Sequence, residues 1–235
     1  MTLDTTSGIF KLMPRRAIPL VTDHYYHIYN RSVGKIPIFN LKRSCIRAVK
    51  LINYYHFTET DIPFSKFNRL NQQVQEESLA KLLKKNDTYV DVVAFSLMPN
   101  HFHFLLKQKK NNGIVTFIAN FQNSYAKFFN TINKRTGALF QNSFKSVYIE
   151  NDAQLLHVSR YIHLNPYSSF LIKNIEKILV YPWSSMPLYF SKKIGFIKPG
   201  IVLGQFSKPA DYKKFVLNQA DYQRSLDLIK HLVKE

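Results

Sequence analysis

The sequence is poor in cysteine, in acidic residues and in long hydrophobic runs, and each shortage excludes a class of protein. Cys45 is the single cysteine of the chain, which excludes an internal disulfide and a thiolate metal cluster and fits a reducing compartment. No hydrophobic run approaches the roughly 18 residues needed to span a bilayer. Residues 1–21 lack the continuous apolar core of a signal peptide. We therefore expect a cytoplasmic protein that is neither exported nor embedded in a membrane.

The shortage of acidic residues leaves a strong positive charge. Fifteen Asp and Glu face 33 Lys and Arg, so the net charge is +18 and the isoelectric point is about 9.9. Such a charge indicates a polyanionic partner, with nucleic acid as the leading candidate. The 19 Phe, 14 Tyr and single Trp are interleaved with the basic residues. Most of the Phe side chains are expected in the core, but some rings could stack on bases.

Strand-like and helix-like patterns alternate along the chain. Aromatic and β-branched residues predict strands over 25–31, 89–95 and 101–106, and one more within 139–149. Apolar residues at three-and-four spacing predict helices over 39–55 and 113–133. Asp152 is the expected N-cap of a further helix over 153–164, which should end at Asn165-Pro166 because proline cannot continue it. Residues 1–20 show no sustained pattern of either kind and are predicted to form an extended arm.

Two histidines separated by one aromatic residue stand out in the strand that begins at residue 101. Side chains two apart on a strand share a face, so His101 and His103 should project together, while Phe102 and Phe104 face the opposite, buried side. Residues 98–100 read as the turn before this strand. The pattern predicts a wet face able to bind a metal ion. The alternative is an ordinary strand with two half-buried histidines and no ligand.

The helix predicted over 153–164 carries a second set of polar side chains. His157, Tyr161 and Asn165 are spaced at i, i+4 and i+8 and so project roughly along one face. A tyrosine with an ordinary pKa of about 10 is a poor nucleophile, and it needs a partner that polarises the group it attacks. A divalent ion held by two histidines would be such a partner. The alternative is a helix tyrosine with a buried ring and a wet hydroxyl.

These two motifs resemble those of a known family. Residues 97–103, which end in His-Phe-His, and Tyr161-Ile162-His163-Leu164-Asn165-Pro166 are similar to the motifs of the IS200-type single-tyrosine transposases, in particular the branch associated with repetitive extragenic palindromes. The resemblance covers about residues 20–190. It implies an α+β fold with an antiparallel sheet flanked by helices, the ferredoxin-like fold of HUH nucleases. The domain division that follows is an arm over 1–20, a catalytic domain over 21–190 and a C-terminal extension over 191–235, whose nine basic and four acidic residues give a net charge of +5.

The resemblance also implies roles for individual residues. His101 and His103 correspond to the metal ligands, and the ion is expected to be Mg²⁺ or Mn²⁺. Tyr161 corresponds to the nucleophile. Asn165 corresponds to an amide that completes the metal site, although many relatives have Gln there. Tyr125 is a competing nucleophile on the helix predicted over 113–133, but its aromatic neighbours favour a core position. The candidate DNA-binding residues are Arg31, Lys145 and Arg160.

The function implied by the resemblance is cleavage and rejoining of single-stranded DNA beside hairpins through a 5′-phosphotyrosine, without a nucleotide cofactor. The expected partner is single-stranded DNA with palindromic, hairpin-forming ends. The protein could act as a monomer or a homodimer. One rival interpretation is a hairpin-binding protein or repressor whose catalytic residues are retained but little used. Another is a histidine-based metal sensor or an RNA-binding module, which explains the charge but not the tyrosine helix.

Overall fold

A computed structural model describes residues 19–191 and 195–225 of the chain. The predicted arm over 1–20 therefore lies almost wholly outside the described residues, as does the end of the C-terminal extension. The helices and strands follow the order expected from the sequence patterns. In chain order the main elements are β1 Tyr25–Arg31, α1 Lys42–Tyr55, α2 Phe64–Phe67, α3 Gln72–Lys85, β2 Val90–Met98, β3 His101–Gln108, α4 Gly113–Ile132, β4 Lys145–Ile149, α5 Asp152–Ser168, α6 Gly200–Leu203 and α7 Pro209–Leu217.

The sheet has four strands in the order β2-β3-β1-β4, and every neighbouring pair is antiparallel. Helix α1 connects β1 to β2 and helix α4 connects β3 to β4, so the core follows the β-α-β-β-α-β order of a ferredoxin-like fold. The predicted fold class, α+β with an antiparallel sheet flanked by helices, is confirmed. The turn predicted at residues 98–100 is also confirmed, because β2 ends at Met98 and β3 begins at His101.

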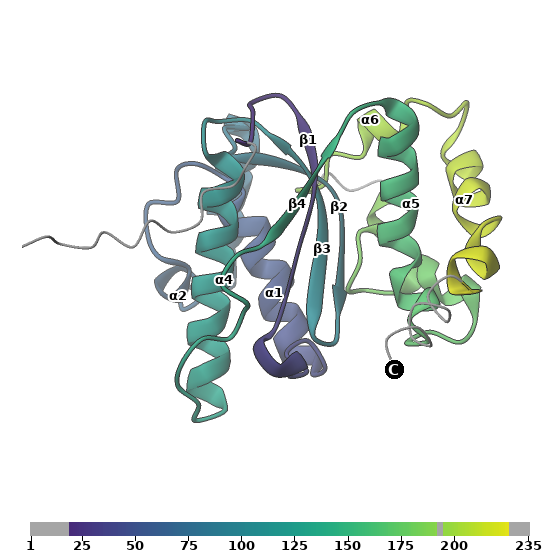
Figure 1. The fold of residues 1–235 in the computed structure, drawn as a ribbon. Coiled ribbons are helices and arrows are strands. Elements are labelled where there is room, and N and C mark those ends of the chain that lie inside the picture. Colours follow the sequence, from purple (N-terminus) through teal and green to yellow (C-terminus); the bar gives the residue numbers. More distant parts are fainter. Residues whose placement is uncertain (1–18, 192–194, 226–235) are drawn as a thin grey trace, which may run out of the picture.

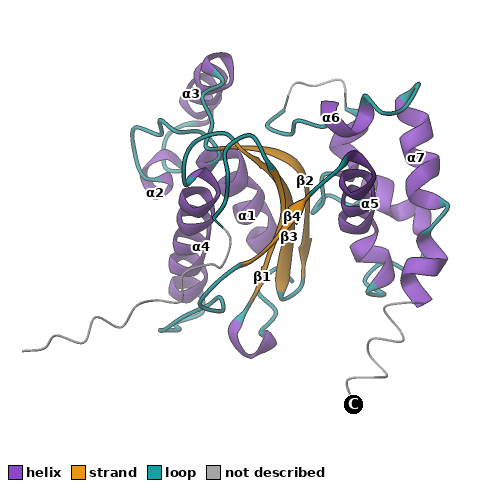
Figure 2. Ribbon diagram, turned by 45° about the horizontal axis from the view of Figure 1, so that its top comes forward, coloured by secondary structure: helices purple, strands orange, loops and turns teal. Residues whose placement is uncertain are grey.

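Helices cover both faces of the sheet. Figure 1 shows α1 and α4 on one side and α5 on the other, with α7 beyond α5 and α6 near one end of α5. Figure 2, from another direction, shows the same three layers with the strands between them. The layer of α1 and α4 buries an aromatic core: the ring of Phe102 lies 5.4 Å from that of Phe121, and the ring of Phe104 lies 5.7 Å from that of Phe117. As the alternation predicted, Phe102 and Phe104 are fully buried on this side.

Helix α5 differs from its prediction at both ends. Its N-cap is Asn151, whose side-chain oxygen accepts a hydrogen bond from the backbone N–H of Gln154, whereas Asp152 is the first helical residue. The helix also passes through Pro166 and ends at Ser168. Proline removes only one backbone N–H, and so close to the C-terminus the last turn is still closed by the bond from Ser169 N to Asn165 O. The end predicted at Asn165 was wrong by one turn.

Helix α7, in the C-terminal extension, packs on the outer side of α5. Tyr212 of α7 is fully buried, and its hydroxyl bonds to Ser159 Oγ at 3.2 Å and to His163 Nδ1 at 2.7 Å. His163 Nε2 reaches Ser185 Oγ at 2.7 Å. Hydrogen-bonded groups on both sides of a buried imidazole fix its ring in place. This part of the C-terminal extension therefore supports the helix that carries Tyr161.

Candidate active site

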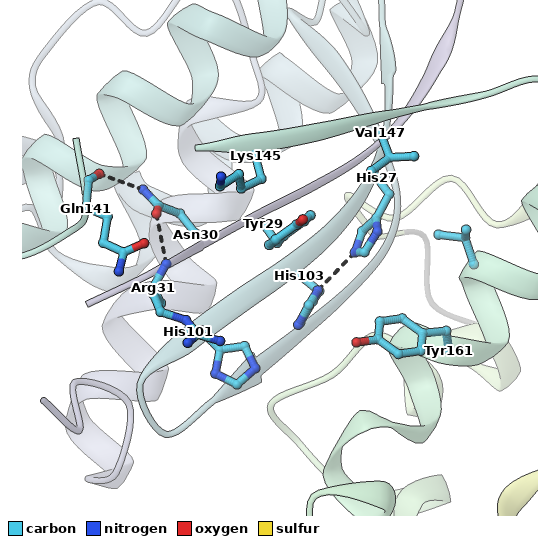
Figure 3. Close-up of a pocket in the computed structure, with 11 residues that line it drawn as sticks. His27, Tyr29, Asn30, Arg31, His101, His103, Gln141, Lys145, Val147 and Tyr161 are labelled. Atoms are coloured by element: carbon cyan, nitrogen blue, oxygen red, sulfur yellow. Dashed lines mark hydrogen bonds between the residues drawn. The ribbon is translucent and has the colours of Figure 1, made fainter. Parts of the chain in front are cut away.

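A cleft of about 630 Å³ opens between the sheet and α5. It is lined by residues from three strands, from the segment before β4 and from α5 (Figure 3). The lining residues are His27, Tyr29, Asn30, Arg31, His101, His103, Gln141, Lys145, Val147, Val158 and Tyr161. No Asp or Glu occurs among these described lining residues. The cleft is therefore suited to an anionic ligand such as a phosphate.

The strand register explains why these residues share one face. On β1, His27, Tyr29 and Arg31 alternate with buried residues and point to the same side. Across the ladder to β3, Tyr29 lies opposite His103 and Arg31 opposite His101. Across the ladder to β4, the same face is completed by Lys145 opposite Tyr29 and Val147 opposite His27. Period-two alternation in three adjacent strands thus produces a continuous polar surface under α5.

The two predicted metal ligands lie side by side in this surface, as the spacing of the motif predicted. The rings of His101 and His103 are 5.1 Å apart and nearly perpendicular, at 82°. His101 Nδ1 lies 2.6 Å from Asn100 Oδ1, and His103 Nδ1 lies 2.9 Å from His27 Nε2. Both Nδ1 atoms are thus engaged by protein groups. On each ring, Nε2 is the nitrogen that faces away from this contact.

The expectation of a wet histidine face was only half right. His101 is partly exposed at the rim, but His103 is only 6% exposed because α5 covers its side of the sheet. Burial lowers the pKa of His27 to about 4, and burial together with the nearby Arg31 charge lowers the pKa of His101 to about 4. Burial also holds the pKa of His103 well below the ordinary histidine value. All three imidazoles are therefore neutral at pH 7, and each has one unprotonated ring nitrogen.

Tyr161 faces this cluster from α5. Its ring lies 5.6 Å from that of His103 and 5.8 Å from that of His27, and both contacts are edge-on, at 87° and 72°. Figure 3 shows its hydroxyl directed into the cleft, toward the side where His103 and His101 lie. A tyrosine from a helix and two histidines from a strand thus meet around one space. The structure brings together the two motifs that are about 60 residues apart in the sequence.

The competing tyrosine lies on the other side of the sheet. Tyr125 of α4 is fully buried, and its hydroxyl donates a hydrogen bond to the carbonyl of Ile38. Its ring packs on Phe39 at 4.8 Å. Burial raises the pKa of this phenol far above its ordinary value, which opposes ionisation. Tyr125 belongs to the aromatic core, as its neighbours in the sequence indicated.

Asn165, the predicted third ligand, lies one helical turn from Tyr161 and does not line the cleft. It is 4% exposed, and its Nδ2 has no hydrogen-bond partner among the described residues. Rotating the amide by 180° would place an oxygen at the unpaired position. A cation, a water molecule or another hydrogen-bond donor could satisfy an amide oxygen there. This unpaired position is compatible with the predicted role of Asn165 as a ligand.

The three candidate DNA-binding residues are not grouped together. Arg31 and Lys145 line the cleft from adjacent strands. Arg160 does not line it: its guanidinium lies 4.3 Å from the centre of the Phe215 ring and donates a hydrogen bond to His157 Nδ1 at 2.7 Å. His157 accordingly points away from the cleft, unlike Tyr161. The face predicted from i, i+4 and i+8 spacing is therefore divided between the site and the packing of α7.

Several lining residues were not predicted as site residues. His27 and Tyr29 could have been found from the same period-two argument that paired His101 with His103, since both lie on the strand predicted over 25–31. Asn30 and Gln141 could not have been found from the sequence, because they come together only in the folded protein. Asn30 Nδ2 donates a hydrogen bond to Gln141 O at 3.0 Å, and Gln141 N donates one to Arg31 O at 2.9 Å. These bonds anchor the end of β1, where Arg31 stands at the rim.

The donors available for a metal ion are two imidazole nitrogens and an amide. Within 19–191 and 195–225, no group of three or more His, Cys, Asp or Glu side chains is placed to hold a metal ion. A site here would therefore use His101 and His103 together with oxygen atoms from an amide, water or phosphate. Such a mixed set fits Mn²⁺ better than Mg²⁺, because Mg²⁺ prefers oxygen ligands alone.

The described residues also contain no helix that could cross a membrane.

Comparisons with known proteins show what this chain is similar to. The model of the IS200-like transposases matches residues 53–165. A solved structure described as a REP-associated tyrosine transposase bound to a REP hairpin is 13% identical, covers 77% of this chain and 87% of its own, and has a TM-score of 0.48. A search of curated proteins found no match. The family resemblance expected from the motifs is confirmed. The matched residues 53–165, which include both histidines of the motif and Tyr161, are similar to the IS200-like transposases.

Proposed function

We propose that this transposase cleaves and rejoins single-stranded DNA beside hairpins, through a covalent link to Tyr161 and with the help of a divalent metal ion. The observation that carries the proposal is the meeting of Tyr161 with His103 in one cleft, at a ring distance of 5.6 Å. The cleft has neutral imidazoles, two cationic side chains and no acidic lining residue among those described. These features suit a scissile phosphate and a tyrosine nucleophile.

Binding comes first in the proposed mechanism. Arg31 and Lys145, on adjacent strands, hold phosphate groups of the DNA in the cleft. His101 and His103 would hold Mn²⁺ or Mg²⁺ through their Nε2 atoms, together with the amide oxygen of Asn165. When bound, the ion neutralises charge that develops on the phosphoryl oxygens. The covering helix α5 keeps His103 out of bulk water, which strengthens electrostatic interactions in the cleft.

Cleavage is a displacement at phosphorus by the Tyr161 oxygen. The new bond joins the tyrosine oxygen to phosphorus, and the bond that breaks joins phosphorus to the 3′ oxygen of the preceding nucleotide. The phenol proton is lost to solvent, and the leaving 3′ oxygen gains one, so the products are a 5′-phosphotyrosine and a free 3′-OH. A 3′-OH from a second DNA end can then attack the phosphotyrosine and release Tyr161. Because the phosphotyrosine link conserves the energy of the phosphodiester, joining requires no nucleotide cofactor.

The deciding experiment is a search for the covalent intermediate. Labelled single-stranded DNA hairpins with single-stranded flanks are incubated with the protein and Mn²⁺, and the products are separated on denaturing gels. We expect a protein–DNA adduct that a protease converts to a smaller species, with the nucleotide mapped to the peptide that contains Tyr161. An adduct on Tyr29, the other tyrosine of the cleft, would reassign the nucleophile. Hairpin binding without any adduct would favour the rival function, a hairpin-binding protein or repressor.

A further inference from the structure

We propose that His27 is a positioning residue for the metal site: it holds His103 in the tautomer whose Nε2 is unprotonated and free to bind the ion. This inference rests on the proposed function, because it assigns a role toward the metal ion of that same site. Its basis is one contact, the 2.9 Å distance between His27 Nε2 and His103 Nδ1 (Figure 3). The family model, which matches residues 53–165, does not include His27.

The contact follows from the sheet. Leu105 lies directly opposite His27 in the antiparallel ladder, so His103 is the diagonal neighbour of His27 on the same face. Diagonal neighbours on one face are within reach of long and aromatic side chains. The His103 ring is also bounded by Tyr29, with ring centres 5.6 Å apart and planes at 25°, and by the edge-on ring of Tyr161. The ring of His103 is thereby held in one orientation.

A single hydrogen occupies the contact between two neutral imidazoles, and its position decides what His103 can bind. If the hydrogen lies on His103 Nδ1, His27 Nε2 accepts it and His103 Nε2 carries a lone pair. If it lies on His27 Nε2, then His103 Nδ1 accepts, and the hydrogen of His103 must lie on Nε2. Only the first arrangement leaves His103 Nε2 able to bind a metal ion. A histidine that binds a metal ion through one ring nitrogen usually donates the N–H of the other to a hydrogen-bond acceptor.

His101, the other proposed ligand, makes a similar contact through its Nδ1 atom, with Asn100 in place of a histidine. His101 Nδ1 lies 2.6 Å from Asn100 Oδ1, an oxygen that can only accept. Asn100 Nδ2 in turn donates to the carbonyl of Lys35 at 3.4 Å, which fixes the amide orientation. His101 Nε2 is therefore left with its lone pair. Each of the two ligand histidines thus has one protein acceptor behind it, Asn100 for His101 and His27 for His103.

The test compares two replacements of His27. His27→Gln keeps an oxygen that can accept from His103 Nδ1, whereas His27→Leu keeps similar bulk without an acceptor. His24→Leu is a matched control, since His24 bonds to the carbonyl of Thr22 and does not line the cleft. Long-range ¹H–¹⁵N NMR spectra of the metal-free proteins report the tautomer of His103. Calorimetric titration with Mn²⁺ reports the affinity, and circular dichroism checks that each variant is folded.

We expect His103 to carry its hydrogen on Nδ1 in the wild-type protein and in His27→Gln, and to show mixed tautomers in His27→Leu. The affinity for Mn²⁺ should fall about 10- to 100-fold in His27→Leu and recover most of the loss in His27→Gln. An unchanged tautomer and affinity in His27→Leu would overturn the inference. So would a loss in His27→Gln with the tautomer retained, because His27 would then be a ligand itself. If the wild-type protein binds no Mn²⁺ and forms no adduct, the proposed function fails, while the NMR spectra still decide the role of His27 in the contact.

Discussion

The two faces of the sheet are built from the same strands and yet have opposite characters. On β3, Phe102 and Phe104 point into the aromatic layer under α1 and α4, where both are fully buried. His101 and His103, one residue away on either side of Phe102, point into the cleft under α5. On β1, Ile28 is buried in the aromatic layer, while His27 and Tyr29 line the cleft. We call these the aromatic face and the histidine face.

On these strands, residues that stabilise the fold alternate with residues of the candidate active site. The aromatic face consists of side chains whose burial stabilises the fold, by about 1.5–3 kcal/mol for each fully buried large side chain. The histidine face buries polar rings at a cost in desolvation, which shows in the lowered pKa values of His27 and His101. Substitutions on the two faces should therefore affect different measurements.

The largest expected difference is between the two candidate tyrosines. Tyr161→Phe removes the hydroxyl on the histidine face and keeps the ring, so the covalent adduct should disappear while the fold and DNA binding persist. Tyr125→Phe removes a hydroxyl in the aromatic core, where its bond to the Ile38 carbonyl contributes about 1 kcal/mol to the stability, and the adduct should remain. Denaturing gels measure the adduct. An adduct formed by Tyr161→Phe but lost in Tyr125→Phe would reverse our assignment.

The next effect concerns the ligands. His101→Ala and His103→Ala should abolish cleavage and leave hairpin binding largely intact, because the removed groups are the proposed metal ligands and, as neutral imidazoles, contribute no charge to DNA binding. Gel-shift titrations and cleavage assays run in parallel separate the two outcomes. His157→Ala is the control, since its ring lies near Phe215 and outside the cleft. Full cleavage in excess EDTA would show that no metal ion is needed.

A substitution on the aromatic face should give the converse result. Phe102→Ala should lower the free energy of unfolding by about 3–5 kcal/mol, because it leaves a cavity between the sheet and α4. The fraction that stays folded should bind Mn²⁺ with wild-type affinity. Urea denaturation and calorimetric titration measure the two quantities. A loss of metal affinity in folded Phe102→Ala would show that the two faces are coupled through the strand.

Acid should destabilise the protein through His163, a buried histidine of α5 that lies outside both faces. Burial lowers the pKa of His163 to about 3, so between about pH 6.5 and that value the unfolded chain binds a proton that the folded protein does not. Stability must therefore fall as the pH falls, by about 2 kcal/mol between pH 7 and pH 5 for one such histidine. In His163→Gln the amide can still bond to Ser185 and Tyr212, and this pH dependence should weaken. Urea denaturation at both pH values checks it; an unchanged pH dependence in the variant would contradict the assignment.

The smallest effect is on the salt dependence of DNA binding. Each phosphate contact made by a cationic side chain contributes about 0.7 to the slope of log affinity against log salt for single-stranded DNA. Arg31→Gln and Lys145→Gln should each reduce the slope by about this amount. Arg160→Gln should change it less, because Arg160 packs on Phe215 outside the cleft. A larger change for Arg160→Gln than for Arg31→Gln would indicate that the DNA binds along α7 and not in the cleft.

Local patterns in the sequence were enough for the elements and for the central pair of ligands. The strand predicted over 25–31 coincides with β1, and the helix over 113–133 coincides with α4 to within one residue. The opposite orientations of His103 and Phe102 needed only the alternation of a strand. The motif resemblance added the antiparallel fold, which the strand pairing bears out.

Tertiary structure alone decided which side chains meet. The contact of His27 with His103 depends on the register of two strands about 75 residues apart, and the burial of His103 depends on α5, a later element that covers its side of the sheet. The orientation of Arg160 depends on Phe215 in α7. A repeating pattern of apolar residues specifies which side chains share a face of one element, because its cause is local backbone geometry. What covers that face is set by packing between distant parts of the chain, which no local pattern contains.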